Sequence, residues 1–433
     1  MKYLSCKDIE SSLYIAPNEV RSCCQRFFFD GEMRGDAKLL EIEEGKTPTS
    51  DDIINAREKL FSQIQKKKSK SCNGCPFLYE TNKKPKFSNE VKHLSIEHHS
   101  YCNLRCNYCS PIYYGGKRSK YDVIQFIEYL NTSGSFKNCK QVVWGGGEPT
   151  LDKSFDLIIK EIHKNANPDL YHRVFTNSVR YHPTIEKLLK QGLIKIVTSV
   201  DAGTKEKFKL VRGRDRFEQL FQNLKKYSNA NSNRVTIKYI LTEDNLDEIE
   251  LDAFVKNCVK NDLANCCYQI SMNYKNEELS LSFLKALLYL MSKFKENKIE
   301  KFFTDDHIAA RFKKLNDKMK SKIFLYIKEK NLSNIIFNEK NFSKINIYGA
   351  GDIAKNIILK NMTNFDNSSI EVYDSDPDKI GTFIGGIKIK KPEKILENTN
   401  KIFISAAQSY DDIYTSLLKM RVEGSRIVSG IFL

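Results

Sequence analysis

The chain has no apolar stretch long enough to span a membrane. Its most apolar helical run, the eleven residues from Leu281 to Met291, contains Lys285, and a spanning helix needs about 20 apolar residues. The first residues also lack the apolar core of a secretory signal, which predicts a cytoplasmic protein. There is no internal repeat and no Gly/Ser-rich or Pro-rich linker, and the length of 433 residues indicates about two to four globular domains.

Cysteine is abundant but unevenly placed. The chain holds twelve cysteines, and none follows Cys267. In a reducing cytosol, spaced cysteines indicate metal ligands or catalytic groups rather than disulfides. Hydrophobic residues make up 41% of the chain and charged residues 29%, which is ordinary for a globular protein and excludes a fibre or a fully disordered chain.

Positive charge is concentrated in the middle of the chain. The net charge is +16, and residues 91–340 hold 42 Lys and Arg against 29 Asp and Glu. Such an excess suits nucleic acid, an acidic small substrate or a merely Lys-rich composition. Much of it lies between Lys285 and Lys330, in a pattern typical of a solvated helical face, and no separate RNA-binding module is visible. The sequence therefore argues against a nucleic-acid partner.

From residue 91 onward, short β-rich runs alternate with helical patterns. This alternation predicts parallel βα units, and six of them can form a partial barrel or an open parallel sheet. Residues 1–90 lack this rhythm and contain one expected helix, Asp51–Gln65, while residues 279–342 are expected to form a wholly helical, basic bridge. The expected strands of the middle region are Val91–His98, Gln141–Trp144, Tyr171–Thr176, Ile194–Val200, Arg234–Leu241 and Cys267–Asn273.

A group of three cysteines follows the first strand of this region. Cys102, Cys106 and Cys109 have the spacing C-x3-C-x2-C, which can hold three corners of an iron–sulfur cubane and leave one iron open. The alternative is a zinc site completed by His98 or His99, and with it a non-catalytic, zinc-stabilised scaffold.

A second motif, VVWGGGEPT, ends the next strand. Together the two motifs resemble the radical S-adenosylmethionine (radical SAM) superfamily, whose signature is CxxxCxΦC, with Tyr108 as the aromatic residue, followed by a GGE-type motif. The resemblance covers about residues 91–275. It implies a [4Fe–4S] cluster on the three cysteines, bound SAM, an electron donor such as flavodoxin or ferredoxin, and a 5′-deoxyadenosyl radical that abstracts hydrogen from a substrate.

The same resemblance implies which residues contact SAM. In the family, the glycines of the second motif bring backbone carbonyls to the SAM ammonium, and polar residues at later strand ends contact its ribose and carboxylate. The positions carried over to this chain are Tyr108, Gly145, Gly146, Gly147, Glu148, Asn177, Ser199, Asp201 and Arg212. The alternatives for the last three are a helix cap, a strand-end polar residue and a solvated arginine.

Five cysteines precede the expected barrel: Cys6, Cys23, Cys24, Cys72 and Cys75. Four such ligands suit zinc or a second iron–sulfur cluster. Beside a radical SAM barrel, they resemble the auxiliary [4Fe–4S] extensions of the SPASM or twitch type, although those usually follow the barrel. We expect Cys6, Cys23, Cys72 and Cys75 as ligands, with Cys24 as the substitute for Cys23.

The last region, 343–433, begins with strand, G-x-G-x-x-A and helix. Gly349 and Gly351 are the fingerprint positions, and Asp374 ends the second strand where a ribose-binding acid would lie. The region resembles small Rossmann-like domains appended to proteins of sugar modification and surface polysaccharide biosynthesis. It either binds a nucleotide or keeps the fold for docking or dimerisation.

The predicted fold class is therefore α/β. It comprises a Cys-rich N-terminal extension (1–90), a partial (βα)6 radical SAM barrel (91–278), a helical bridge (279–342) and a Rossmann-like subdomain (343–433). The predicted substrate is a small molecule such as a sugar or nucleotide-sugar. A peptide substrate and, less favoured by the sequence, an RNA substrate are the alternatives.

Overall fold

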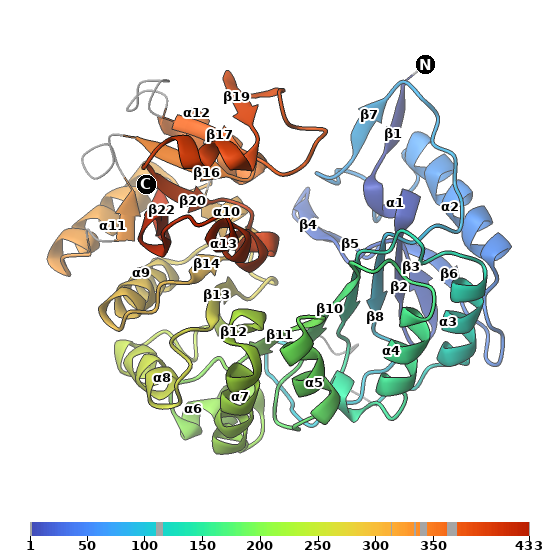
Figure 1. Cartoon of the computed structure of the whole chain (residues 1–433), viewed down its shortest axis with the longest axis horizontal. Helices are drawn as coiled ribbons and strands as arrows, with labels where there is room; N and C mark the ends of the chain where they lie inside the picture. The colour runs from blue at the N-terminus through green and yellow to red at the C-terminus, as the bar shows by residue number, and fades with distance from the viewer. Residues whose placement is uncertain are drawn as a thin grey trace. The chain divides into compact units, whose positions relative to one another are not determined.

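A computed structural model describes residues 2–109, 116–312, 314–332, 335–337, 344–361 and 370–432. The chain divides into two compact units, Met1–Thr198 and Ser199–Leu433, and both combine helices with parallel strands (Figure 1). The division falls inside the segment 91–278 that the sequence predicts as one barrel. A mixed α/β fold with a parallel sheet is confirmed.

One sheet organises the first unit. Its five parallel strands lie in the order β11, β10, β9, β8, β2, and β3 and β6 continue it antiparallel. Four strands match the expected runs to within a few residues at each end, as is usual for strand boundaries. The bounds are β11 Ile194–Ser199, β10 Tyr171–Phe175, β9 Gln141–Trp144, β8 His93–Ile96, β2 Ser12–Ile15, β3 Glu19–Arg21 and β6 Lys38–Glu41.

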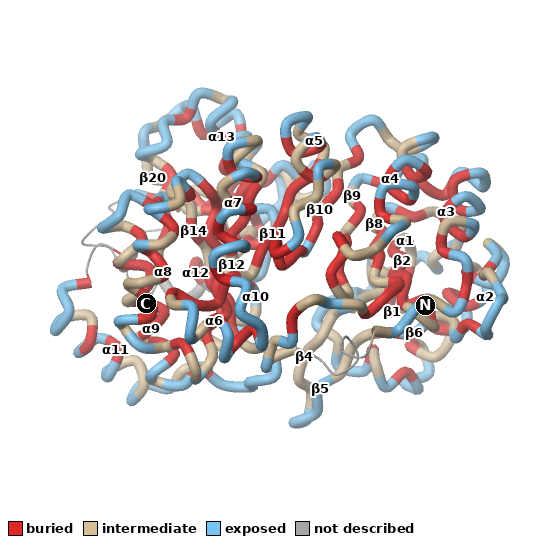
Figure 2. The backbone as a smooth tube through the Cα atoms, turned by 90° about the horizontal axis from the view of Figure 1, so that it is seen from below, coloured by how far each residue is buried: buried red, intermediate tan, exposed pale blue. Residues whose placement is uncertain are grey.

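Three amphipathic helices, α3 (Val123–Thr132), α4 (Phe155–His163) and α5 (Pro183–Gln191), cover one side of this sheet (Figure 1). Their buried residues recur at helical spacing, as with Phe126, Ile127 and Leu130 in α3. Figure 2 shows the same arrangement by burial, because the strands are buried while the helices expose their outer faces. The βα rhythm read from the sequence is confirmed in this unit.

The N-terminal region is joined to the first expected barrel strand. Strand β2 pairs in parallel with β8, so that Ser12 lies opposite His93 and Ile15 opposite Ile96. The fully buried guanidinium of Arg57 stabilises this junction by donating hydrogen bonds to the backbone oxygens of Ser12 and Ser88. This pairing was not predicted, because β2 has only four residues and is too short for a recognisable pattern.

The rest of the N-terminal region surrounds one long helix, α2 (Ser50–Gln65). This helix is the one expected at Asp51–Gln65, and it begins at a capping box in which Thr49 and Asp52 exchange hydrogen bonds. The other elements are β1 (Tyr3–Ser5), which pairs antiparallel with β7 (Tyr79–Thr81), α1 (Lys7–Ser11), and the hairpin of β4 (Arg26–Phe29) and β5 (Glu32–Gly35).

The second unit begins with three parallel strands, β12 (Val235–Leu241), β13 (Cys267–Met272) and β14 (Phe302–Thr304). The expectation of a wholly helical bridge at 279–342 is wrong at β14. The aromatic and β-branched side chains of this segment suit a strand, and the edge of β13 is available to pair with it. The helices are α6 (Lys205–Arg212), α7 (Phe217–Asn231), α8 (Glu248–Lys260), α9 (Leu281–Glu296), α10 (Asp306–Phe312) and α11 (Asp317–Glu329).

A six-stranded sheet occupies the C-terminal part of the second unit. The strand order is β18, β19, β17, β16, β20, β21, and all neighbours except β18 and β19 are parallel. The elements are β16 (Ile345–Tyr348), α12 (Asp352–Asn361), β17 (Ile370–Tyr373), β18 (Phe383–Ile384), β19 (Ile387–Lys390), β20 (Lys401–Ile404), α13 (Tyr410–Lys419) and β21 (Ile427–Val428), with β15 (Ile336–Phe337) and β22 (Ile431–Phe432) forming a separate pair.

This C-terminal sheet shares a core with β13 and β14. Cys267 packs among the buried tyrosines of the C-terminal part, and Phe303 stacks on Tyr410 with ring centroids 4.9 Å apart. Thr236 donates a hydrogen bond to Asp411. Because Thr236 and Cys267 lie at the start of their strands, the C-terminal part contacts the amino ends of β12 and β13.

None of the described helices combines the length and apolar character that crossing a bilayer requires.

Candidate functional site

The segment that leads from β8 into the cysteine loop runs beside the residues that follow β9. The backbone N–H of Gly145 donates to the oxygen of Ile96, and that of Gly147 to the oxygen of His99, both at 3.1 Å. The N–H of Glu148 continues the pattern toward Tyr101. The two motifs read from the sequence are thus in direct contact within the first unit.

This close approach explains two of the three glycines. A Cβ atom at Gly147 would lie 2.0 Å from the backbone oxygen of Tyr101, and one at Gly146 would lie 2.8 Å from that of His99. Gly146 also has φ +85°, a conformation that disfavours other residues. These glycines let the two chains meet, and the carbonyl contact with SAM remains a prediction.

Glu148 is a buried carboxylate that joins two segments. Its Oε1 accepts hydrogen bonds from the hydroxyls of Thr150 and Thr176, each at 2.7 Å, and its Oε2 accepts from the backbone N–H of Asn177 at 2.7 Å. Burial raises the pKa of this carboxyl group, and the hydrogen bonds oppose that shift. Glu148 therefore fixes the end of β10 against the end of β9.

Asn177 carries this connection to the cysteine loop. Its side-chain Nδ2 donates to Oδ1 of Asn103 at 2.6 Å and lies 3.8 Å from Sγ of Cys102. Its Oδ1 accepts from the backbone N–H of Val179. The amide is therefore oriented toward the first cysteine of the motif, and N–H donors directed at sulfur stabilise a bound thiolate.

The three loop cysteines differ in exposure. Cys102 is exposed, Cys106 and Cys109 are half-buried, and Tyr108 is half-buried beside them. Four thiolates around one zinc ion lie about 3.8 Å apart. Within the described part of the chain, only one group of three candidate ligands has all its ligand atoms within 4.8 Å of one another, and it contains no cysteine. The assignment of the loop cysteines to an iron–sulfur cluster stays a prediction.

The second unit contains a buried ion pair at two of the predicted SAM positions. Arg212 donates to Oδ2 of Asp201 at 2.8 Å, and Oδ1 of Asp201 accepts from the backbone N–H of Ile240 at 2.7 Å. Asp201 is fully buried and Arg212 is 4% exposed, so Arg212 is not a solvated residue. The pair holds the turn after β11 against β12, and Ser199 is the last residue of β11.

The N-terminal cysteines gather from separate segments. Cys6 and Cys23 pack against the cluster that includes buried Cys72, and the N–H of Cys75 donates to the oxygen of Cys72 at 3.1 Å. Cys24 is exposed and is absent from this cluster. Burial raises the pKa of Cys6 to about 12 and that of Cys23 to about 11, and nearby acidic groups and cysteines add to the shift.

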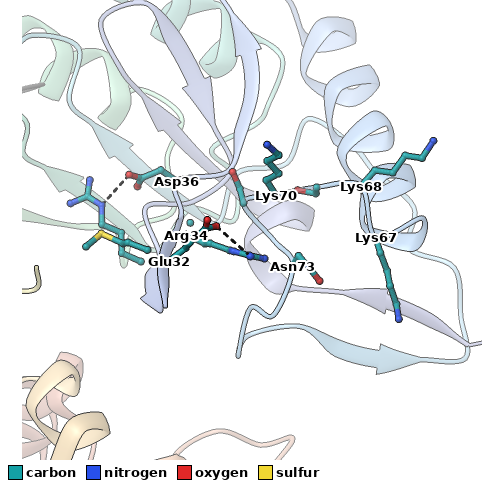
Figure 3. A pocket seen from close by; sticks show the side chains of 12 residues that line it. Glu32, Arg34, Asp36, Lys67, Lys68, Lys70 and Asn73 are labelled. Carbon is teal, nitrogen blue, oxygen red and sulfur yellow. Dashed lines mark hydrogen bonds and ion pairs between the residues drawn. The ribbon is translucent and has the colours of Figure 1, made fainter. Parts of the chain in front are cut away.

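An open hollow of about 490 Å³ lies beside these cysteines. Its walls come from the β4–β5 hairpin and from residues 67–73, and they include Arg34, Asp36, Lys67 and Lys68. Arg34 pairs with Glu32, while Lys67 and Lys68 extend away from Arg34 and Asp36 (Figure 3). The basic side chains do not converge on one point, so the hollow does not form an anion cradle.

At the C-terminal glycine motif, the structure gives Asp374 local partners. Its Oδ2 accepts from the backbone N–H of Ala350 at 2.7 Å and from Lys379 at 3.1 Å. Gly349 has φ +104°, whereas a Cβ at Gly351 would meet no atom within 4 Å. Asp374 thus holds the glycine turn that the sequence predicts as a nucleotide site.

Sequence reasoning missed one polar cluster in the first unit, formed by His98, His99 and Asp152. The two histidines were considered only as zinc ligands alongside the loop cysteines. Their ligand atoms instead gather with Asp152. A His-His doublet followed by an acid just after the glycine motif was the available signal.

A comparison with protein families matches residues 96–254 to the Radical SAM superfamily. The chain contains a radical SAM domain. The match includes the cysteine loop, the glycine motif and Asn177, which the structure brings together. The predicted class of enzyme is confirmed at the level of the superfamily, and this superfamily implies a [4Fe–4S] cluster and SAM.

Curated relatives match about two fifths of the chain. GTP 3′,8-cyclase of Mannheimia succiniciproducens is 28% identical over 176 residues, which is 40% of this chain and 51% of that protein. The enzyme of the same name from Pasteurella multocida is 27% identical over 171 residues, covering 39% and 50%. The chain therefore spans about half the length of the curated relatives that it matches.

Solved structures give a more distant likeness. Streptococcus suis SuiB bound to its precursor peptide SuiA is 14% identical, with a TM-score of 0.42, and the match covers 61% of this chain and 66% of that one.

Proposed function

We propose that this protein reductively cleaves SAM and uses the resulting 5′-deoxyadenosyl radical to abstract hydrogen from a small, phosphate-bearing molecule such as a nucleotide or nucleotide-sugar. One electron from a donor such as flavodoxin or ferredoxin breaks the sulfur–C5′ bond and yields methionine and the radical. The radical takes a hydrogen atom from a substrate C–H bond and becomes 5′-deoxyadenosine.

The observation that carries this proposal is the connected site in the first unit. Glu148 and Asn177 fix the glycine motif to Cys102 through hydrogen bonds of 2.7 to 3.8 Å. We assign Cys102, Cys106 and Cys109 to the cluster and Asn177 to SAM, and we place the six expected βα units in a partial barrel. The Asp201–Arg212 pair acts by positioning the turn after β11, because its charges are already partnered.

Two features support a phosphate-bearing substrate. The curated relatives that the chain matches are named for a reaction of GTP, and residues 91–340 carry a positive charge excess that attracts anions. The alternative is a peptide, which is the substrate class of SuiB.

The decisive experiment measures 5′-deoxyadenosine after anaerobic cluster reconstitution and reduction with dithionite. The reconstituted chain forms it from SAM, Cys106→Ala forms none, and Cys139→Ala, a cysteine outside both groups, forms normal amounts. Equal formation by Cys106→Ala would contradict the cluster assignment. The substrate class follows from deuterated nucleotides, nucleotide-sugars and peptides, because only the true substrate transfers deuterium to 5′-deoxyadenosine.

We further propose that Cys6, Cys23, Cys72 and Cys75 hold a second [4Fe–4S] cluster of the SPASM or twitch type. Three of them border one apolar cluster although they are up to 66 residues apart in sequence. The segments bearing Cys6 and Cys23 leave the sheet at the amino end of β2, whereas the loop 102–109 follows the carboxyl end of β8. This placement suits an electron relay or a structural role better than contact with substrate.

The C-terminal part is proposed to be Rossmann-like. Its strand order, with β17 and β20 on either side of β16, is that of a doubly wound sheet. Because Cys267 belongs to its core, nucleotide binding is best measured on the full chain. Saturable binding of NAD(H) or a UDP-sugar that Gly349→Val abolishes supports a nucleotide site, and no binding supports docking.

A further inference from the structure

His98, His99 and Asp152 form a buried cluster just before the cysteine loop. Nε2 of His98 lies 3.1 Å from Oδ2 of Asp152, and the two imidazole centroids are 4.9 Å apart at an interplanar angle of 80°. His98 is 7% exposed and His99 is 5% exposed. All three ligand atoms lie within 4.8 Å of one another.

The convergence of the two imidazoles is unusual for neighbouring residues. Successive side chains of an extended chain point in opposite directions, but these two meet at one carboxylate. Asp152 belongs to a different segment, which follows the turn Pro149–Leu151, and its Oδ1 accepts from the N–H of Ser154 at 2.8 Å. Its Oδ2 is therefore the atom left to face the histidines.

One buried polar atom of the cluster, Nδ1 of His98, has no hydrogen-bond partner, and the only partner of Oδ2 of Asp152 within the cluster is Nε2 of His98. Unsatisfied buried polar atoms are costly. Two ligands about 2.1 Å from one metal ion lie about 3.0–3.4 Å apart, which matches the observed separation of 3.1 Å.

We propose that His98, His99 and Asp152 bind one divalent transition-metal ion, separate from any iron held by the cysteines. Two imidazole nitrogens and one carboxylate oxygen suit Zn²⁺, Fe²⁺ or Co²⁺. The ion joins the segment before the cysteine loop to the turn after the glycine motif, and so supplements the connection that Glu148 makes.

Metal binding also changes the contact nearest to the cysteine loop. In the metal-free chain, the N–H of Tyr101 donates to Nδ1 of His99 at 3.2 Å. A metal ion on either nitrogen of His99 ends this bond, because the metal occupies Nδ1 or the proton moves to it. Tyr101 directly precedes Cys102, so the ion affects the backbone at the first cluster ligand.

The test is zinc content and zinc K-edge X-ray absorption of the full chain after iron–sulfur reconstitution, zinc loading and gel filtration. We expect one zinc per chain with a nitrogen and oxygen shell near 2.0–2.1 Å and no sulfur shell near 2.3 Å. The variants His99→Gln and Asp152→Asn should lose this zinc ion, while their iron content stays unchanged. His163→Gln, a histidine outside the cluster, keeps it.

Three results would overturn the proposal: no zinc beyond background, zinc with a sulfur shell only, or equal nitrogen-bound zinc in the chain and in both variants. Circular dichroism separates loss of the site from loss of the fold, and Asp152→Asn serves if His99→Gln fails to fold. Because this experiment measures metal content and not activity, a negative result would contradict the metal site without contradicting the proposed cleavage of SAM.

Discussion

The two groups of cysteines in the first unit are organised in opposite ways. Cys102, Cys106 and Cys109 lie within eight consecutive residues on one loop, and that loop is held by hydrogen bonds from polar neighbours such as Asn177. The N-terminal ligands come from three distant segments and border an apolar cluster under α2. One site is therefore defined by local spacing and the other by the packing of a core.

This difference has an electrostatic consequence. The apolar surroundings of Cys6 and Cys23 favour the protonated thiol, which raises their pKa values. Metal ions must displace those protons. Backbone N–H donors oppose this rise in pKa at Cys6 and Cys23, and N–H donors also reach Cys102 in the loop, so burial is the feature that distinguishes the N-terminal group. The two sites should then differ in how they load iron.

The largest expected effect separates the two sites by iron content. Replacing the three loop cysteines with alanine should remove about four iron atoms per chain and all 5′-deoxyadenosine formation. Cys72→Ala/Cys75→Ala should also remove about four iron atoms but keep SAM cleavage, because the iron that binds SAM is in the loop. Iron, sulfide and zinc assays check this. Retained iron in the second variant would rule out an N-terminal cluster, and zinc in its place would assign that site to zinc.

The pH dependence of metal loading sharpens the comparison. In the variant without loop cysteines, burial raises the pKa of Cys6 to about 12 and that of Cys23 to about 11, and it also raises the pKa values of Cys72 and Cys75, so each thiol that binds metal at pH 7 releases one proton. Apparent metal affinity should rise about tenfold per pH unit for each such proton between pH 7 and 9. Competition with a chelator measures it, and a flat profile would contradict buried, protonated thiols.

The same raised pKa values determine the stability of the metal-free fold. The folded pKa values lie above that of a free thiol, about 8.5, so the native state holds more protons than the unfolded state above this pH. The contribution of these two thiols to the free energy of unfolding is fully present below pH about 8.5 and is lost as the pH rises toward 11–12. Urea unfolding of the metal-free chain at pH 7.5 and 9.5 checks the direction.

A pair of glycine substitutions compares the rigidity of the two regions. At Gly147 a Cβ would lie 2.0 Å from the backbone oxygen of Tyr101, whereas at Gly74 it would lie 2.0 Å from the ring of Phe29. A side chain can move more readily than a backbone. We expect Gly147→Ala to lower the free energy of unfolding by about 2–4 kcal/mol. This loss should exceed that of Gly74→Ala, although Gly74 also has φ +75°. Gly351→Ala, with open space around it, is the control, and equal effects at Gly147 and Gly351 would refute this account.

The smallest expected effect concerns the connection at Glu148. Glu148→Gln replaces one acceptor oxygen by an NH₂ group, so the donor from Thr176 or Asn177 loses its partner. Glu148→Gln should lower the free energy of unfolding by about 1–3 kcal/mol. It should also lower the iron retained by the loop cysteines and leave the iron of the N-terminal cysteines unchanged. The exposed change Glu44→Gln is the control. Iron loss from both groups would show that Glu148 supports the whole unit.

The sequence by itself determined the repeating βα pattern and the chemistry of the loop. Strand β9 and helix α2 lie where they were predicted, to within one residue, because their hydrophobic spacing depends only on neighbouring residues. The grouping of Cys102, Cys106 and Cys109 was also predictable from the sequence, because the three residues lie within eight consecutive positions. The glycine motif was likewise readable, although its contact with Tyr101 was not.

Only the tertiary structure decided which distant residues meet. The pairing of β2 with β8, the strand at Phe302–Thr304 and the shared core at Cys267 depend on which sheet edges and apolar faces are left to cover, and a short sequence window does not carry that information. The same applies to the meeting of His98 and His99 with Asp152. Long-range contacts depend on the packing of the whole core, whereas the spacing of neighbouring residues can be read directly from the sequence.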